Sequence, residues 1–503
     1  MKNLINTIIK PLIALAVVAS ATIGCSRDFL TTTPVGRDLE VNYYQTQEQA
    51  FAALVSVYDV LQWNDQYGFT MFRFLMNVAS DDTHAGGSDA SDQPSWVATN
   101  DFSWTPNLGP QAGFWRKNYK GIYRANLYLE KIDDIDDASL AFKTRTKAEA
   151  RFLRAKFFFD LVRLFGNVPL LQETLDPSQY YTVSQAEPDA VLSFVETELR
   201  AVASDLPLAS ALGSSEIGRA TNGAAKALLA RVLLFTNDDT KMAEVVTLCS
   251  DIINSGEYSL LSDYGDLFTE AGEWGSESVF EITHAANSAS DWGRFGQGHS
   301  EGNVGVQFCG MRDYNGPDFA PGWGFCPISL DLEEAMDGDP RYQHTIIDAD
   351  NLAGAEYTAG YQNTGFFMKK YAPMASLQAP DGDIALNWGN NIREIRYADV
   401  LLMAAEGLAR SGGSEGTARS YLNQVRTRVG LPGVGASGQA LLDAIFDERR
   451  LEFATEGHRY FDLIRTGRAS SVLSGWSTDK QFLPIPQNEI DAANGTLTQN
   501  PGY

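Results

Sequence analysis

The residue types that most often carry out chemistry are present in this chain, but not in catalytic or metal-binding patterns. The five histidines never recur three or four residues apart: His84, His284, His299, His344 and His458. HExxH is absent, which argues against a helical zinc-hydrolase site. No GxxxxGK[ST] occurs, and no GxGxxG or GxSxG follows a predicted strand, so nucleotide-binding and nucleophile-elbow chemistry find no support.

Acidic residues are abundant, with 64 Asp and Glu against 39 Lys and Arg. Chance pairs of carboxylates are therefore guaranteed, and a glycosidase pair is defined by its separation in space, which a sequence does not give. The acidic runs at 133–137 and 337–339 lack the spacing of a calcium-binding EF-hand loop, which favours a solvated surface over a calcium site. We expect no catalytic residue, no metal and no cofactor.

Aromatic side chains in glycine-rich segments offer a different chemistry, which is ligand recognition. Residues 257–393 contain 18 of the 44 glycines and four of the nine tryptophans, but only six Lys and Arg, and they show no sustained helical period. A shorter segment at 80–113 has the same character. Because long loops on a rigid scaffold commonly carry binding surfaces, these two segments are the candidate binding loops.

Helices must position these loops. Apolar residues spaced three and four apart predict a helix through Ala148 and Val162 that stops at Gly166. Similar periodicity predicts further helices at 46–61, 115–132, 189–204, 222–235, 241–254, 395–410, 416–428 and 439–455. We expect about nine helices in antiparallel pairs.

Small residues recur at one spacing in two of these pairs. Ala230 and Ala243 lie 13 residues apart, and so do Ala405 and Ala418. Small residues where two helices cross allow close approach in tetratricopeptide-type (TPR) repeats. The pattern predicts a mostly α fold, with a TPR-like scaffold of helical pairs and long irregular insertions that carry the ligand site. A plain helical-hairpin bundle is the alternative.

The chain has 503 residues, of which 44% are hydrophobic, and a net charge of −25. It has no surplus of Lys and Arg for sequence-independent binding to nucleic acid. Its four cysteines do not make a disulfide-stapled scaffold. Cys249, Cys309 and Cys326 lie in the body of the chain, where a disulfide between the last two and buried thiols are both open alternatives.

Residues 1–24 have the composition of a secretory signal peptide, with two lysines, no acidic residue and an apolar run at 12–18 followed by small residues. That run is too short to span a bilayer, which needs about 20 apolar residues. Cys25 follows this segment directly and resembles the acylated cysteine of a bacterial lipobox, although Thr22 stands where leucine is usual.

Acylation of Cys25 would anchor the body to a membrane surface. The mature chain would then carry a net charge of −27, because cleavage removes two lysines and no acidic residue. Residues 25–40 would form the lipidated tether. Ordinary signal-peptidase cleavage near Ala21 is the alternative.

The carboxy-terminal part contains a regular pattern of charges. Glu448, Glu452 and Glu456 recur every fourth residue, beside Arg449 and Arg450. This arrangement is suited to ion pairs that lock helices and loops together, and we favour it over a catalytic role for these acids.

Several sequence blocks carry a resemblance to a known family. The carboxy-terminal blocks are RYADVLLMAAEGLAR at 396–410, YLNQVRTRVGLP at 421–432, ERRLEFATEGHRYFDLIRTGR at 448–468, LPIPQNEI at 483–490 and a final QNPGY. The amino-terminal blocks are FAALVSVYDVLQ, YRANLYLEKI and ARFLRAKFFFDLVRLFGNVPLL. Together they closely resemble the SusD/RagB family of outer-membrane glycan- or nutrient-binding lipoproteins of Bacteroidetes.

The resemblance implies a non-catalytic protein, lipid-anchored in the outer membrane and exposed at the cell surface. Such a protein captures an oligosaccharide or polysaccharide and delivers it to a SusC-like TonB-dependent transporter. By this resemblance, residues 41–256 form the SusD-like amino-terminal TPR-like region and residues 257–503 the SusD/RagB carboxy-terminal region. The latter divides into the binding insertion at 257–393 and a helical part with a tail at 394–503.

The resemblance also implies that ligand contacts come from the two candidate binding loops. Our candidates for stacking on sugar rings are Trp96, Trp292 and Trp323. The candidate polar partners are Asp82, Asn100 and Arg312. Packing within the protein is the alternative for each tryptophan. Two other functions remain open: an oligopeptide or other nutrient-binding lipoprotein of the same architecture, and a secreted glycoside hydrolase.

Overall fold

Helices dominate the computed structural model, which describes residues 43–64, 69–286, 291–292, 301–380 and 382–503. Residues 46–503 form one unit. The predicted signal peptide, Cys25 and the tether lie outside the described residues. Among the described residues, no helix has the length and apolar character needed to cross a membrane.

The nine predicted helices are all present in the structure. They are α4 (Gln47–Asp59), α7 (Gln111–Lys131), α8 (Leu140–Phe165), α9 (Pro188–Val202), α10 (Asn222–Phe235), α11 (Met242–Ser255), α15 (Tyr397–Arg410), α16 (Glu415–Arg428) and α17 (Gln439–Glu452).

Shorter elements lie between and after these helices. The short helices are α5 (Phe72–Val78), α6 (Pro94–Asn100), α12 (Val304–Cys309), α13 (Leu330–Ala335), α14 (Tyr342–Thr345), α18 (Arg459–Arg465), α19 (Ala469–Val472) and α20 (Gln487–Ala492). Three antiparallel two-stranded sheets pair β1 (Val168–Pro169) with β2 (Gln185–Ala186), β3 (Ser278–Ile282) with β6 (Ile392–Arg396), and β4 (Ile346–Asp348) with β5 (Phe366–Met368).

Local signals set the ends of the longest helix, α8. The Ser139 side chain accepts a hydrogen bond from the backbone N–H of Phe142 at the amino-terminal end. At the carboxy-terminal end, Gly166 adopts a φ of +66°, a conformation that side chains with a Cβ rarely tolerate. The predicted stop at this glycine is confirmed.

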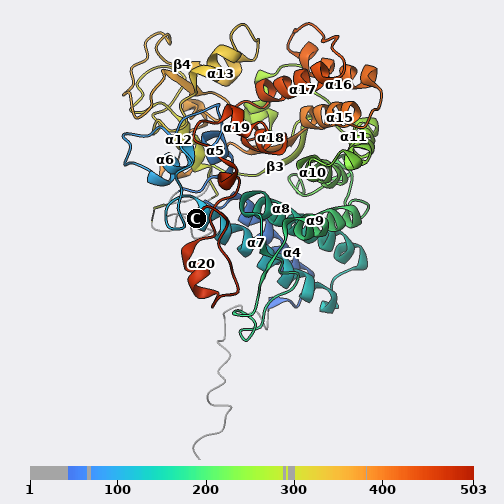
Figure 1. The fold of residues 1–503 in the computed structure, drawn as a ribbon. Coiled ribbons are helices and arrows are strands. Elements are labelled where there is room, and N and C mark those ends of the chain that lie inside the picture. Colours follow the sequence, from blue (N-terminus) through green and yellow to red (C-terminus); the bar gives the residue numbers. More distant parts are fainter. Residues whose placement is uncertain (1–42, 65–68, 287–290, 293–300, 381) are drawn as a thin grey trace, which may run out of the picture. The chain divides into compact units, whose positions relative to one another are not determined.

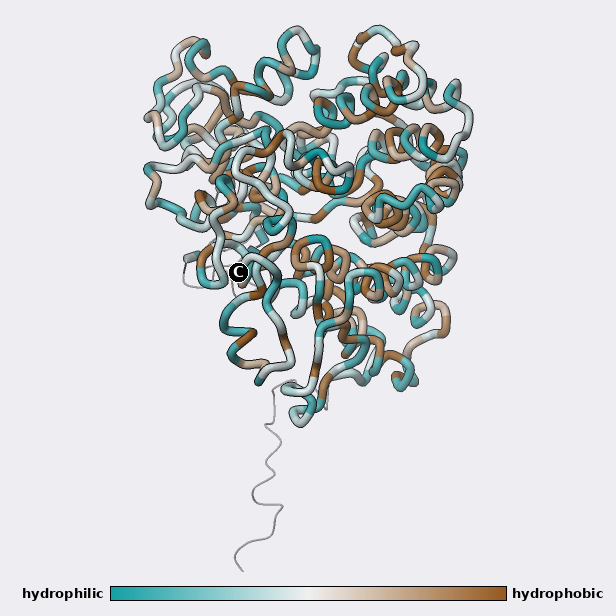
Figure 2. The backbone as a smooth tube through the Cα atoms, in the orientation of Figure 1, coloured by the Kyte–Doolittle hydropathy of each residue, from teal (hydrophilic) through white to brown (hydrophobic). Residues whose placement is uncertain are grey.

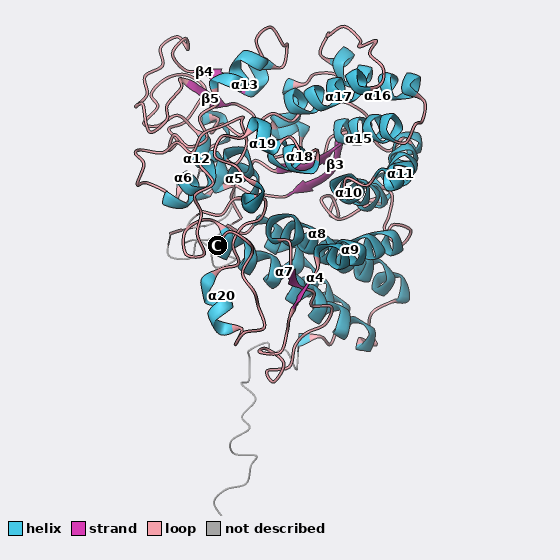
Figure 3. Ribbon diagram, viewed as in Figure 1, coloured by secondary structure: helices cyan, strands magenta, loops and turns pink. Residues whose placement is uncertain are grey.

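The long helices pack in chain order, each against the next, from α7 through α8, α9 and α10 to α11 (Figures 1 and 3). The series then continues directly from α11 to α15, and from there to α16 and α17. Residues 256–396 therefore leave the scaffold after α11 and return beside it at α15. This arrangement confirms the predicted TPR-like scaffold with a long insertion.

The predicted role of small residues at the helix crossings is correct at three positions and wrong at one. Ala230, Ala405 and Ala418 are fully buried, but Ala243 is exposed. In α11 the inward face carries Met242 instead, so the next residue points away from the core.

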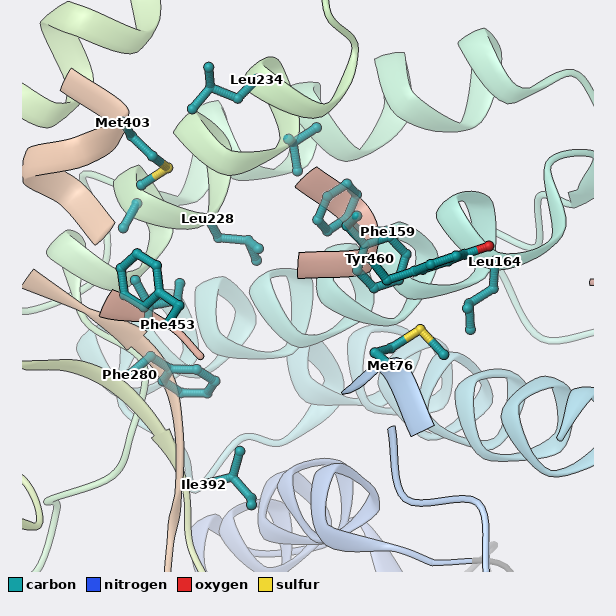
Figure 4. Close-up of a cluster of buried hydrophobic side chains, with 14 of the residues drawn as sticks. Met76, Phe159, Leu164, Leu228, Leu234, Phe280, Ile392, Met403, Phe453 and Tyr460 are labelled. Atoms are coloured by element: carbon teal, nitrogen blue, oxygen red, sulfur yellow. The ribbon is translucent and has the colours of Figure 1, made fainter. Parts of the chain in front are cut away.

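The hydrophobic core runs through the helical stack and continues beneath the insertion. Figure 2 shows many hydrophobic residues along the helices of the stack, and Figure 4 shows part of the buried cluster. Its members come from elements far apart in sequence, including Met76, Phe159, Leu228, Met403 and Tyr460.

A buried network of ion pairs crosses this core. Glu452 is fully buried and lies within 3.0 Å of the guanidinium groups of Arg341, Arg396 and Arg428. Glu448 and Glu456 extend the network. Their partners are Arg341 and Arg426 for Glu448, and Arg396 and Lys370 for Glu456. The predicted locking role of these three acids is confirmed.

A second group of buried charges lies on β6 and α15. Glu394 pairs with Arg73, Lys156 and Arg231. Asp399 accepts hydrogen bonds from Arg231 at 2.8 Å and from Arg449 at 2.6 Å. Helices α5, α8, α10, α15 and α17 are thereby connected through charges that are shielded from water.

Neutralising the centre of this network should strongly destabilise the protein. Glu452→Gln leaves the guanidinium groups of Arg341, Arg396 and Arg428 buried with one negative charge fewer, so we expect the free energy of unfolding to fall by about 3–5 kcal/mol. Urea denaturation would measure the change. The matched control is Glu244→Gln, which removes the surface partner of Arg200 and should cost less than about 1 kcal/mol. Equal effects of the two variants would contradict a structural role for the network.

Acid should weaken the buried ion pairs through their carboxylates, and the pair of Glu406 on α15 with Arg465 on α18 is an example. Burial alone would raise the pKa of Glu406, but the guanidinium of Arg465 lowers it to about 2. An unfolded Glu has a pKa of about 4.3, so the stabilisation is complete above about pH 5 and is lost as the pH falls towards 2. We therefore expect Glu406→Gln to flatten the fall in unfolding free energy between these pH values, as measured by urea titrations. The control Glu415→Gln, at a side chain that is 41% exposed, should retain the wild-type slope.

Candidate ligand-binding surface

The two candidate binding loops lie side by side. The backbone around Thr83 and Gly86 forms bridges with Ile328 and Phe325. Two further hydrogen bonds of 2.9 Å, from Gly87 N–H to the Gly324 carbonyl and from Ser329 N–H to the Asp82 carbonyl, extend this pairing. The short loop and the insertion therefore build one surface.

Trp323 is held in this surface by its own backbone. Its N–H donates to the Gln307 carbonyl at 2.9 Å, and the Phe325 N–H donates to the Phe308 carbonyl at 2.9 Å. The two segments approach closely at Gly310 and Gly322, where a Cβ on Gly322 would lie 2.3 Å from the Gly310 Cα. Because no side chain fits there, glycine is required at this crossing.

Three aromatic rings gather beside this crossing, and one of them, Phe69, comes from the segment just before α5. Trp292 and Trp323 stack with ring centroids 6.0 Å apart and an interplanar angle of 25°. Phe69 meets both edge-on, at 6.3 Å from Trp292 and 6.1 Å from Trp323. Trp292 is 42% exposed and Trp323 is partly exposed. We call Phe69, Trp292 and Trp323 the aromatic platform.

Trp96 does not belong to the exposed face of the platform. Its exposed fraction is 0%, and its ring stacks on Phe308 at 4.9 Å with an interplanar angle of 25°. Phe308 in turn contacts Trp323 at 4.9 Å. The expectation that Trp96 stacks on a ligand is therefore corrected: α6 turns this ring inward, and Trp96 supports the platform from below.

Of the predicted polar partners, Arg312 contacts the platform. Its side chain is partly exposed, and its Nη1 lies 3.5 Å from the Trp323 carbonyl oxygen. Asn100 is engaged within the protein, since its Nδ2 donates to the Val78 carbonyl and its Oδ1 accepts from Gln362. Asn100 thereby ties the two binding loops together.

Asp82 is a structural residue and does not face a ligand. Its exposed fraction is 1%, and its carboxylate pairs with Arg450 of α17 at 2.9 Å. Burial raises the pKa of Asp82, although the guanidinium of Arg450 opposes this effect. The expectation that Asp82 is a polar partner of the ligand is corrected accordingly, because this ion pair fixes the short loop to the helical scaffold.

Phe69 and Phe308 were missed by the sequence analysis. Phe69 adopts a φ of +47°, a strained backbone conformation of the kind that often marks functional sites. A single phenylalanine between two aromatic-rich segments carries no sequence signal of its own. Phe308 lies in the predicted insertion, but only tryptophans were predicted to stack on a ligand.

The three described cysteines are buried free thiols. Burial and a hydrogen bond with Cys326 raise the pKa of Cys309 well above its ordinary value. In the described part of the chain, no group of three or more His, Cys, Asp or Glu side chains is arranged to hold a metal ion.

Comparisons with known proteins identify the family of the chain. A family model described as "Starch-binding associating with outer membrane" matches residues 39–234, and the SusD family model matches residues 301–475. A solved structure named "Laminarin binding SusD-like protein" is 38% identical, with a TM-score of 0.85, and the match covers 92% of this chain and 100% of that one. The chain belongs to the SusD family.

Other relatives agree with this assignment. Surface glycan-binding protein A from Bacteroides thetaiotaomicron, solved in complex with laminarihexaose, is 33% identical to this SusD-family chain with a TM-score of 0.82, over 91% of this chain and 100% of that one. SusD-like protein P25 from Formosa agariphila is 25% identical over 500 residues, which cover 92% of this chain and 93% of the relative. The predicted family and its mostly helical fold are confirmed.

The buried and exposed tryptophans should differ in their effect on stability. Trp96→Ala removes a fully buried ring, so we expect the free energy of unfolding to fall by about 3–5 kcal/mol. Trp292→Ala removes a half-exposed ring and should cost less than about 1 kcal/mol. Urea denaturation of both variants checks this. A Trp96→Ala protein as stable as the wild type would contradict a supporting role for this ring.

Proposed function

We propose that this SusD-family protein binds a glycan on the aromatic platform and has no catalytic activity. The observation that carries the proposal is the stacked pair of Trp292 and Trp323, which lies on the insertion with Trp292 42% exposed. Aromatic rings pack well against the apolar C–H faces of sugar rings. Arg312 beside them, and the exposed carboxylate of Asp313, offer hydrogen bonds to sugar hydroxyls.

The packing of aromatic rings beneath the platform supports this role. Trp96 and Phe308 hold the platform from below, so the exposed rings lose little conformational freedom when a ligand binds. Laminarin is the first ligand to test, because two similar solved proteins are named for binding laminarin or are solved with laminarihexaose.

The proposed cellular setting follows from the leader and the family. We propose that Cys25 is acylated and holds the protein at the outer membrane, exposed at the cell surface. The family model for residues 39–234 is described as associating with the outer membrane, which supports this location. We further propose that the captured glycan passes to a SusC-like TonB-dependent transporter.

Isothermal titration with laminarin tests the binding role. We expect Trp323→Ala and Trp292→Ala each to weaken binding at the platform at least tenfold, which corresponds to about 1.4 kcal/mol. The control is Trp274→Ala, which removes an exposed tryptophan outside the platform and should leave the affinity within about twofold. Unchanged affinity in both platform variants would contradict the assignment of the site.

Two further measurements separate the alternatives. If no neutral glycan binds but peptides co-purify with the protein, the oligopeptide-binding alternative replaces the proposal. If reducing ends are released from a bound polysaccharide, the protein is a glycoside hydrolase. We expect neither result.

A further inference from the structure

A cavity lies on the helical scaffold, and none of its lining residues belongs to the aromatic platform. It is bounded by α7, by the loop that follows β1 and by the segment that begins with α20. Its volume is about 850 Å³, within the range of about 300–1,000 Å³ that is usual for ligand sites. We call it the tyrosine cleft, after the side chains of Tyr119, Tyr123, Tyr180 and Tyr181 that line it.

Exposed aromatic rings are concentrated in this cleft. Tyr123, Tyr180 and Tyr181 are 43%, 55% and 58% exposed. Outside the cleft, the exposed large aromatic side chains among the described residues are Phe51, Trp274 and Trp292. A cluster of exposed apolar rings around a concave surface marks a binding site more often than chance exposure does.

The loop wall of the cleft is firmly attached to α7. The Asn126 Nδ2 donates to the carbonyls of Leu171 and Glu173, both at 3.0 Å. The Tyr119 hydroxyl donates to the Pro169 carbonyl at 2.9 Å. The short antiparallel pairing of β1 with β2 closes the base of the loop. Residues 169–185 therefore form a wall of the cleft whose position is fixed by hydrogen bonds to α7.

The opposite wall comes from the carboxy-terminal segment, which runs beside α7 at this end of the scaffold (Figure 1). The Gln487 N–H donates to the Pro106 carbonyl at 3.1 Å, at the start of α20. The Thr498 N–H donates to the Gln185 side chain of β2 at 2.8 Å, which joins the two walls. Both walls are thus fixed by hydrogen bonds within the protein.

The charges in the cleft indicate which ligand it would accept. Arg116, Lys120, Glu173 and Glu489 line it, two positive and two negative. In a chain of net charge −25, this local balance favours neither a polyanion nor a cation. The tyrosines combine an apolar face with a hydroxyl that can both donate and accept hydrogen bonds. A neutral ligand with apolar faces and many hydroxyls matches this lining.

We propose that the tyrosine cleft is a second saccharide-binding site, which holds a neutral oligosaccharide independently of the aromatic platform. The proposal takes its ligand class from the proposed function, but it rests on a different set of residues. Two separate sites on one body raise the affinity for a polysaccharide long enough to reach both, without any new contact at either site.

Titration with laminarihexaose tests the second site. We expect the wild-type protein to bind two equivalents. A Trp292→Ala, Trp323→Ala variant should retain one equivalent, and adding Tyr180→Ala and Tyr181→Ala should abolish the remaining binding. Tyr180→Phe and Tyr181→Phe keep the rings, so a variant with these changes should retain most of the affinity of the cleft for laminarihexaose. The control Phe51→Ala removes an exposed ring that does not line the cleft and should change nothing.

The outcomes separate this proposal from the proposed function. If the wild-type protein binds one equivalent and the Trp292→Ala, Trp323→Ala variant binds none, the second site is overturned and the platform assignment stands. A wild-type protein that binds no neutral glycan on affinity gels would contradict the proposed function itself. A different result is that the Tyr180→Ala, Tyr181→Ala changes leave the number of bound saccharides as it is in their absence, while the protein no longer captures the co-expressed transporter. That result would overturn the saccharide assignment and make the cleft a docking surface. Urea denaturation of each variant confirms that it is folded.

Discussion

A buried network of charges determines how the helical scaffold and the loop insertion meet. Arg396 at the end of β6 pairs with Glu277, Glu452 and Glu456, and all four side chains are buried. A charge in such a place is tolerable only when its partners are also in place. The network therefore favours one arrangement of these elements over others, because any shift would leave a charge buried and unpaired.

The same constraint reaches the candidate ligand-binding surface. Arg450 of α17 pairs with Asp81 and Asp82 of the short loop and with Asp331 of the insertion. Its neighbours on that helix, Glu448 and Glu452, belong to the buried network. One helix thus positions both loops, and the exposed rings of the platform rest on aromatic side chains that the core holds in place.

Most of the scaffold was predictable from the sequence because its signals are local. Periodic apolar residues and the glycine at 166 place the helices and the end of α8 correctly. Whether a predicted site residue is buried or exposed depends on contacts with residues far away in the sequence. Asp82 pairs with a residue 368 positions away, and Trp96 is covered by Phe308 and Phe325. Sequence spacing contains no information on such contacts, so a buried ring and an exposed ring of the same type look alike.

The return of the chain to α15 beside α11 makes the insertion an exchangeable module. Gly407 of α15 lies against Met242 and Val246 near the start of α11, so the two helices are antiparallel and the ends of the insertion are close together. Each doubling of a loop of this kind costs only about 0.6 kcal/mol in closure entropy. A replacement could therefore alter the ligand while the helices stay as they are, provided that it also supplies the charges that the insertion contributes to the buried network, such as Glu277. Arg341 and Lys370 of the insertion neutralise Glu448 and Glu456, and a new module must present positive charges at the same two points.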